Sequence, residues 1–151
     1  MIVELNSEAS MKQFGQTLGG LLRGGEVLEL VGDVGAGKTT LTKGIALGIG
    51  IGETVQSPSF TISRVYDAST GIRLAHYDFY RLSDAGIMAN ELAEATSDPQ
   101  TVTIVEWASI VDDVLPTDRL SISITSPSET SRRVEIAAGG EKSNTILEQL
   151  T

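Results

Sequence analysis

The chain has 151 residues and no cysteine, and its 11 basic and 20 acidic residues give a formal net charge of −9. A domain of this length buries roughly 68–70% of the surface that its unfolded chain exposes, so we expect one domain, residues 1–151, that folds without disulfides. The composition excludes a thiolate zinc site and a cysteine nucleophile, and the acidic balance argues against direct binding of nucleic acid, because like charges repel.

The N-terminal region carries no signal for export or membrane insertion. The chain starts Met-Ile-Val-Glu-Leu, which places an acid where a secretory signal would be basic. No apolar run approaches the ~20 residues that a membrane-spanning helix requires. The sequence therefore predicts a soluble, cytoplasmic protein without a membrane partner.

The first predicted elements are a strand over residues 2–5 and a helix over residues 8–22. The strand alternates apolar and polar side chains. Ser7 is a typical N-cap, and Glu8 places a negative charge near the positive end of the helix dipole. Helical spacing predicts one buried face, made of Met11, Phe14, Leu18, Leu21 and Leu22.

An apolar strand over residues 26–31 leads into the pattern GxxxxGK[ST], which residues 32–39 satisfy. Its glycines let backbone N–H groups turn towards phosphate oxygens, and a helix starting after Thr39 adds its dipole to this cradle. Lys38 can reach the β- and γ-phosphates, and the Thr39 hydroxyl can join a Mg²⁺ shell. The correct flanks favour this interpretation over a glycine-rich turn that binds nothing. The residues expected around the phosphates are Val34, Gly35, Ala36, Gly37, Lys38, Thr39 and Thr40. We expect glycines 48, 50 and 52 to stop the helix.

A polar loop, residues 56–61, follows about twenty residues after Lys38. In P-loop proteins a switch segment at this place can bring a hydroxyl to the γ-phosphate and Mg²⁺. Ser59 is the candidate hydroxyl. An ordinary loop before a strand explains the same spacing equally well, so the spacing leaves both interpretations open.

Strands over residues 60–66 and 72–79 are predicted to form a hairpin that ends in a candidate carboxylate, Asp78. Ligand sites of open α/β sheets collect at the carboxyl ends of strands, which makes Asp78 a candidate site residue; a solvated or salt-bridged aspartate is the alternative. His76 is the single histidine and shares the alternating face of Asp78. We interpret it as a hydrogen-bonded structural residue.

A second candidate carboxylate, Glu106, follows a β-branched strand over residues 101–105. An apolar strand that ends in an acid downstream of a P-loop has the form of a Walker B element, whose carboxylate holds Mg²⁺ or its water. We expect Trp107 to pack at the edge of the sheet, although it could stack near a nucleotide. A helix over residues 83–96 should come before this strand, with Ile87, Met88 and Leu92 facing the core and Glu91 and Glu94 facing outwards.

The remaining segments are interpreted as scaffold. Residues 110–115 predict a short turn or helix, and residues 141–150 predict a terminal helix. Alternating residues 120–124 and 134–137 predict an antiparallel pair at one edge of the sheet, and Arg132 and Arg133 beside it are interpreted as solvated. The whole pattern predicts a three-layer α/β fold of the P-loop NTPase-like type, with a mixed sheet of about seven strands and flanking helices.

These parts suffice to bind ATP with Mg²⁺ and to hydrolyse it, because such catalysis consists mainly of positioning and charge stabilisation. We assign Lys38 to the β- and γ-phosphates and Thr39 with Glu106 to Mg²⁺. Asp78 would orient the attacking water or complete the outer shell. No arginine finger is recognisable, and such a finger contributes about 10³–10⁵ in rate, so slow turnover that a partner accelerates is expected.

Three other classes of nucleotide-binding protein share part of this pattern. A small-molecule kinase would usually carry an arginine-rich lid, and the seven arginines here are scattered. A GTPase should show an Asn-Lys-x-Asp motif, which is absent. A non-catalytic ATP-binding adaptor stays open, because ATP-dependent assembly requires binding alone.

Four motifs in order resemble the TsaE (YjeE) family of bacterial P-loop ATPases. They are the P-loop through Thr40, Ser57-Pro-Ser-Phe60, His76-x-Asp78-x-Tyr-Arg-Leu82 and Val105-Glu-Trp107. The resemblance implies an ATPase required for the N6-threonylcarbamoyl modification of adenosine 37 in tRNA, acting with the TsaD and TsaB proteins and meeting tRNA only through that complex.

The same resemblance implies roles for individual residues. The Ser-Pro-x-Phe loop would be a switch, Thr39 and Glu106 would hold Mg²⁺, and the helix start near Glu8 would lie by the adenine. The chain departs from the family pattern twice: Ser59 stands where the family loop usually has threonine, and Leu92 falls where a glycine is common in the following helix.

Overall fold

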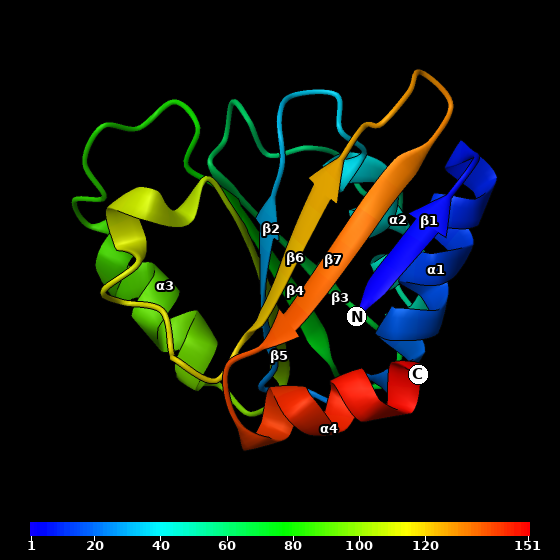
Figure 1. Ribbon diagram of the computed structural model, residues 1–151. Coiled ribbons are helices and arrows are strands. Elements are labelled where there is room, and N and C mark those ends of the chain that lie inside the picture. The colour runs from blue at the N-terminus through cyan, green and yellow to red at the C-terminus, as the bar shows by residue number, and fades with distance from the viewer.

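A mixed seven-stranded sheet forms the middle of the molecule, and helices cover both of its faces (Figure 1). The computed structural model describes residues 1–151. The strands are β1 (Ile2–Leu5), β2 (Val27–Val31), β3 (Ser63–Asp67), β4 (Arg73–Asp78), β5 (Thr101–Glu106), β6 (Leu120–Thr125) and β7 (Arg132–Ala138). The helices are α1 (Glu8–Leu21), α2 (Lys38–Ile49), α3 (Met88–Ser97), the 3₁₀ helix η1 (Ala108–Val111) and α4 (Glu141–Leu150). This is the predicted three-layer α/β fold of the P-loop NTPase-like type.

The strand order is β1-β7-β6-β2-β5-β4-β3. The four central strands β6, β2, β5 and β4 run parallel, while β3, β7 and β1 pair antiparallel at the two sides. Glu106 pairs in register with Leu30 on one side and with Asp78 on the other. Because parallel strands end at the same edge, the P-loop and both candidate carboxylates meet there.

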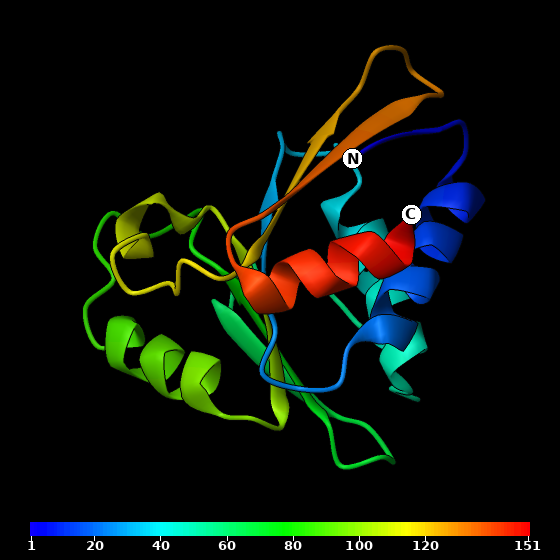
Figure 2. The same cartoon turned by 60° about the horizontal axis from the view of Figure 1, so that its bottom comes forward.

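Helices α1, α2 and α4 cover one face of the sheet, and α3 with η1 covers the other (Figure 2). The core is divided accordingly: Leu28, Leu30 and Ile104 pack beneath the first group, whereas Val27, Tyr77 and Val105 pack beneath the second. Central strands that are buried on both faces need apolar residues at successive positions, which explains the near-continuous apolar runs of β2 and β5. None of the helices combines the length and the apolar composition that crossing a membrane requires.

Glycines bring α1 and α2 into backbone contact. A Cβ atom added at Gly15 would lie 2.6 Å from the Leu41 carbonyl oxygen, and one added at Gly19 would lie 2.2 Å from the Ile45 carbonyl oxygen. Gly44 and Gly48 show the same close approach from the other helix, at 2.2 and 2.3 Å from the backbone oxygens of α1. No side chain fits between these backbones, so the two helices pack as one unit.

Several predicted boundaries are confirmed, and others are wrong. The first strand and the last helix have the predicted bounds, and Ser7 caps α1 by accepting a 3.0 Å hydrogen bond from the Ser10 N–H. Helix α1 ends at Leu21, one residue early. Helix α2 passes through Gly48, which packs on α1, and ends only at Gly50, whose φ of 102° is left-handed.

The helix predicted over residues 83–96 begins late, at Met88. Residues 83–87 form bends and turns instead, and Ile87, expected in the core, is 84% exposed. Leu92 is the only fully buried residue of α3, and Met88 packs beside it, partly buried, against the same core cluster, so the expected core positions are confirmed for these two residues and wrong for Ile87. Gly86, with a φ of 54°, favours a turn over a helix here.

The β-hairpin and the C-terminal strand pair also differ from the prediction. Strand β3 starts at Ser63, because residues 59–62 form a turn in which Ile62 has a left-handed φ of 71°. Strands β6 and β7 are antiparallel as predicted but do not form the sheet edge. β1 lies outside β7, and β6 pairs with β2 in the centre.

Candidate nucleotide-binding site

The P-loop connects β2 to α2 at the carboxyl edge of the sheet (Figure 1). Gly35 and Gly37 have left-handed φ values of 84° and 114°, which side chains other than glycine rarely adopt. Gly37 is the N-cap residue of α2, and no side chain caps this helix. The first N–H groups of α2 and the positive end of its dipole therefore face the loop, an arrangement that suits an anion.

Two cavities meet at the P-loop and share Gly35, Gly37 and Thr40. The smaller, about 260 Å³, is also lined by Val34, Lys38, Thr39, Ser57, Ser59, Asp78, Tyr80, Glu106 and Trp107. The larger, about 470 Å³, is also lined by Asn6, Ser7, Glu8, Met11, Glu129, Thr130 and Arg132. Every predicted site residue except Ala36 lines one of the two, and Ala36 is buried within the loop itself.

Lys38 lies at the floor of the smaller cavity and is only 7% exposed. Its ammonium group donates a hydrogen bond to the Gly32 carbonyl and lies 3.8 Å from Glu106 Oε1. The same ammonium is 4.3 Å from the centroid of the Trp107 ring, a cation–π contact. The positive charge is thus held between the P-loop and the end of β5.

Glu106 is 3% exposed, and its carboxylate lies between the Lys38 ammonium group and the His76 imidazole. Its Oε1 faces Lys38, and its Oε2 lies 2.6 Å from His76 Nε2. His76 is fully buried on β4, so the hydrogen bond that we expected for this histidine is made to a candidate site carboxylate.

Asp78 connects the candidate switch loop to the cavity. Its Oδ2 accepts a 3.1 Å hydrogen bond from the Ser59 hydroxyl, and its Oδ1 accepts a 2.9 Å hydrogen bond from the Tyr80 N–H. The hydroxyls of Ser57 and Ser59 lie 2.8 Å apart. The loop thus places two hydroxyls at the smaller cavity, as a switch segment would require, and an ordinary loop before a strand stays the alternative.

The prediction for Trp107 is wrong. Trp107 follows a central strand rather than an edge strand, and its half-buried ring lines the smaller cavity. The Tyr80 ring packs against it at 4.8 Å between centroids. Trp107 also has a left-handed φ of 55°, which is strained for a bulky residue and is typical of functional sites. Its place directly after Glu106 was the available signal.

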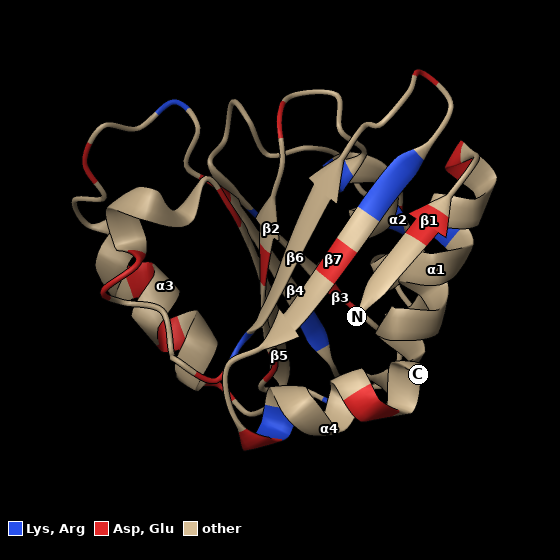
Figure 3. Cartoon of the chain, in the orientation of Figure 1, with Lys and Arg blue, Asp and Glu red and all other residues tan.

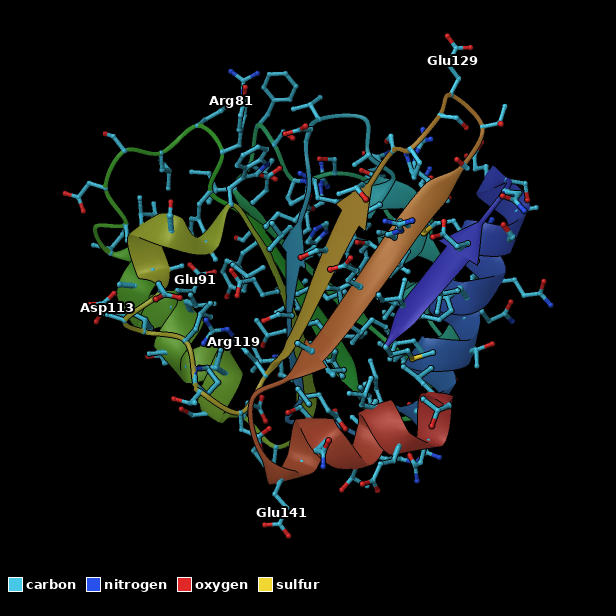
Figure 4. The ribbon with its side chains drawn as sticks, in the orientation of Figure 1. Arg81, Glu91, Asp113, Arg119, Glu129 and Glu141 are labelled. Carbon is cyan, nitrogen blue, oxygen red and sulfur yellow. The ribbon has the colours of Figure 1, made fainter.

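Arg132 is a second correction, because it is not a solvated strand residue. Its Nε donates a 3.0 Å hydrogen bond to the Ala36 carbonyl, and its Nη1 donates to the carbonyls of Ser128, Glu129 and Ser131. These bonds tie the β6–β7 loop, whose tip carries Glu129 in Figure 4, to the P-loop. A contact across 96 positions leaves no local signal in the sequence.

The oxygen-rich lining of the smaller cavity suits Mg²⁺. The hydroxyl of Thr39 and the carboxylates of Asp78 and Glu106 are hard oxygen donors from three different elements. No group of three or more His, Cys, Asp or Glu residues could hold a metal ion alone. Mg²⁺ is usually held by one or two carboxylates together with substrate phosphates, so the donor set fits a nucleotide-bound Mg²⁺ rather than a protein-only cage.

Basic and acidic positions are distributed over many elements of the chain (Figure 3). Arg133, adjacent to Arg132 on β7, is exposed and pairs with Glu4, whose carboxylate lies 2.7 Å away and raises the arginine pKa through this hydrogen bond and its charge. Of the two adjacent arginines, one is therefore engaged with the P-loop and the other with β1. Neither forms part of a basic patch.

Comparisons with known proteins identify the family of this chain. The family model described as "Threonylcarbamoyl adenosine biosynthesis protein TsaE" matches residues 5–134, a range that contains every residue of both cavities. The tRNA threonylcarbamoyladenosine biosynthesis protein TsaE of Bacillus subtilis is 39% identical over 128 residues, 84% of this chain and 78% of that protein. Its counterpart in Streptomyces coelicolor is 40% identical over 115 residues, 76% of this chain and 78% of that protein.

A solved structure shows the same architecture. The crystal structure of YdiB from Bacillus subtilis aligns with a TM-score of 0.81 and 32% sequence identity, covering 99% of this chain and 93% of that one. The family match, the identity to these relatives and the shared fold agree, and the chain belongs to the TsaE family.

Proposed function

We propose that this protein binds ATP with Mg²⁺ and hydrolyses it slowly, as the ATPase component of the machinery that forms N6-threonylcarbamoyladenosine at position 37 of tRNA. The observation that carries the proposal is the smaller cavity, where Lys38, Thr39, Asp78 and Glu106 come together beside the P-loop from three elements of the chain. The relatives named for this biosynthesis support the pathway. The single domain would act in the cytoplasm.

The two cavities suggest how a nucleotide would lie. The triphosphate would follow the P-loop backbone from Val34 to Thr40 into the smaller cavity, where Lys38 would neutralise the terminal phosphates. The nucleoside would occupy the larger cavity beside Glu8. Mg²⁺, when bound between Thr39, Glu106 and the phosphates, would supply the charge that phosphoryl transfer requires.

The carboxylates and the loop would complete the site. Asp78 would orient the attacking water, and the Ser59 hydroxyl, bonded to Asp78, would couple this position to the loop over residues 56–61. No arginine lines the smaller cavity. Arg132, in the larger one, already donates to four backbone carbonyls, and Arg81 stacks on the exposed Phe60 ring, 4.6 Å from its centroid. This is the basis for expecting slow turnover that partners accelerate.

The partners would be the homologues of TsaD and TsaB. Direct binding of tRNA is disfavoured by the net charge of −9, so the protein would meet tRNA only through the complex. An acidic ATPase can act on such a complex through contacts with its protein components alone.

Titration of the purified protein with ATP and with GTP, followed by measurement of phosphate release with and without the TsaD and TsaB homologues, tests the proposal. We expect a preference for ATP, Mg²⁺-dependent release and acceleration by the partners. Binding of ATP without hydrolysis under any of these conditions would replace the ATPase with a nucleotide-binding adaptor. Absence of ATP binding would refute both.

A further inference from the structure

His76 is buried behind Glu106, outside the lining of both cavities, and the proposed function gives it no role. Its side chain is 0% exposed and lies on β4, two residues before Asp78 and on the same face of the sheet. Its Nε2 is 2.6 Å from Glu106 Oε2, while its Nδ1 is buried and has no hydrogen-bond partner.

These two nitrogens determine what the ring can do. A carboxylate only accepts hydrogen bonds, so Nε2 carries a proton and donates a hydrogen bond to Glu106. An unprotonated Nδ1 without a partner costs less free energy than an Nδ1–H without a partner, since an unpaired buried N–H would lose its full hydration. Because Nδ1 has no hydrogen-bond partner, the ring has no second group through which it could pass a proton. The ring is therefore an orienting donor rather than a proton relay.

Glu106 needs such a donor because its other partner is shared. Lys38 lies 3.8 Å from Oε1, but Lys38 is also the group that would bind the phosphates of the nucleotide. Once the Lys38 ammonium group binds a phosphate, the hydrogen bond from His76 is the remaining side-chain contact that fixes the Glu106 carboxylate. A glutamate has three rotatable side-chain torsions, and burial alone leaves the direction of its oxygens open.

We propose that His76 is a positioning residue, whose Nε2–H holds Glu106 Oε2 so that Oε1 faces Mg²⁺ or its bound water. The proposal rests on the proposed function, which places Glu106 at that ion. Groups that hydrogen-bond to metal-binding carboxylates and histidines, without touching the metal themselves, typically contribute 10–100-fold in metal affinity or activity. The alternative is a histidine that only fills space beneath the P-loop.

Two amide substitutions at His76 distinguish the positioning role from the space-filling role. His76→Gln places an amide nitrogen where Nε2 lies, whereas His76→Asn places the same group where Nδ1 lies, out of reach of Glu106. Trp107 is the only tryptophan and contacts Lys38, so its fluorescence reports Mg²⁺ and ATP binding without reference to turnover. For each variant we would measure the Mg²⁺ concentration that gives half of the fluorescence change at saturating ATP, together with kcat and KM.

We expect His76→Asn to raise the half-saturating Mg²⁺ concentration about 10-fold to 100-fold and to lower kcat in the same range, with little change in the KM for ATP. His76→Gln should stay close to wild type. Equal behaviour of the two variants, or an unchanged Mg²⁺ titration in His76→Asn, would overturn the positioning role. A wild-type protein whose fluorescence does not respond to ATP would instead refute the proposed function, and the role of His76 with it.

The wild-type protein offers a test that does not depend on folding of a variant. With one histidine in the chain, ¹⁵N-histidine labelling gives a single imidazole in the NMR spectrum. We expect a proton on Nε2 in a hydrogen bond to Glu106, with that hydrogen bond kept when Mg²⁺ and ATP are added. A ring protonated at Nδ1 alone, or loss of the Nε2–H bond on addition, would overturn the inference.

Discussion

The two helical layers are attached to the sheet in different ways. On one face, glycines let the α1 and α2 backbones touch, so the helix that follows the P-loop is placed by contacts that leave no free space. On the other face, α3 fully buries only Leu92, with Met88 and Ala95 partly buried beside it. Figure 2 shows α3 on the other side of the sheet from α1 and α2, with loops at both of its ends. The comparison suggests that the chemistry depends on the first layer and that the second is free to serve other contacts.

Polar contacts of α3 support this contrast. Glu91, labelled in Figure 4, accepts hydrogen bonds from Ser63 at 3.4 Å and from the Tyr77 hydroxyl at 3.5 Å, both at the long limit of such bonds. Burial, assisted by the charge of Glu91, raises the pKa of Tyr77 to about 12. The phenol therefore remains a donor at physiological pH, but its bond to α3 is weak.

The largest effect is expected from Lys38→Ala. Removing the buried ammonium takes away the one positive charge that lines the smaller cavity, and loss of such a charge stabiliser typically costs about 10²–10³ in rate. The measurement is phosphate release together with ATP binding. Lys43→Ala, an exposed lysine on the same helix, is the control and should leave both unchanged. Hydrolysis at the wild-type rate in Lys38→Ala would refute the P-loop assignment.

Glu106→Ala should have the next largest effect, about 10-fold to 100-fold on Mg²⁺-dependent turnover and less on ATP binding. The reason is that the proposed function assigns Glu106 to Mg²⁺ or its water rather than to the nucleotide. Steady-state kinetics at varied Mg²⁺ would measure it. Glu91→Ala on α3 is the matched control from the other layer, with intrinsic turnover expected to be unchanged. A greater loss of ATP binding than of turnover in Glu106→Ala would show that its role differs.

Gly19→Ala tests the backbone contact between α1 and α2. The new Cβ would lie 2.2 Å from the Ile45 carbonyl oxygen, so the helices must separate, and the expected loss of stability is about 1–3 kcal/mol. Gly20→Ala is an adjacent control with nothing within 4 Å of its Cβ, and the better helix propensity of alanine should stabilise it by about 0.5–1 kcal/mol. Urea unfolding measures both. Equal stabilities would mean that the close packing contributes nothing.

The smallest effect concerns α4, far from the site. Asp118 accepts hydrogen bonds from the Ser143 hydroxyl at 2.6 Å and from the backbone N–H groups of Lys142 and Ser143 at 3.0 Å, and these bonds lower its pKa. The pKa of Asp118 is lower in the folded than in the unfolded protein. Its ionised carboxylate therefore contributes to folding stability at pH values above the unfolded-state pKa, and this contribution is lost as the pH falls through the folded-state pKa. At neutral pH, Asp118→Asn should cost about 1 kcal/mol, the usual value of a helix cap.

Thermal unfolding between pH 7 and pH 2.5 would measure this contribution. The difference in Tm between wild type and Asp118→Asn should shrink towards acid pH. Asp113→Asn, an exposed aspartate with no hydrogen-bond partner, is the control and should show no such convergence (Figure 4). A difference that stays constant with pH would contradict the ionic part of this cap.

Much of the fold and most of the site could be predicted from local patterns. The P-loop, β5 with Glu106, and β1 follow from short-range rules of periodicity and spacing, and the structure has them as predicted. The order of the strands makes β2, β4 and β5 neighbours, which is why Asp78 and Glu106, 28 positions apart, meet as predicted at one edge.

The errors arise where long-range packing overrides a local rule. Gly48 is a poor helix residue, yet it lies within α2 because only glycine fits against α1 there. The apolar residues before Met88 suggest a helix face, but the core beneath that segment is already filled from η1 and the sheet, and Ile87 remains in solvent. Arg132 looked solvated because its partner, Ala36, lies on a different element.

The sequence by itself determined that this protein has a GxxxxGK[ST] loop, two strand-end carboxylates and the motifs of one family, since these depend on residue type and spacing along the chain. Only the tertiary structure decided which groups hold those carboxylates. The bond from His76 to Glu106, the contact of Lys38 with Trp107 and the cap from Asp118 to α4 all join distant positions. Such pairings depend on strand order and on the distance between helices, which are settled when the whole core packs.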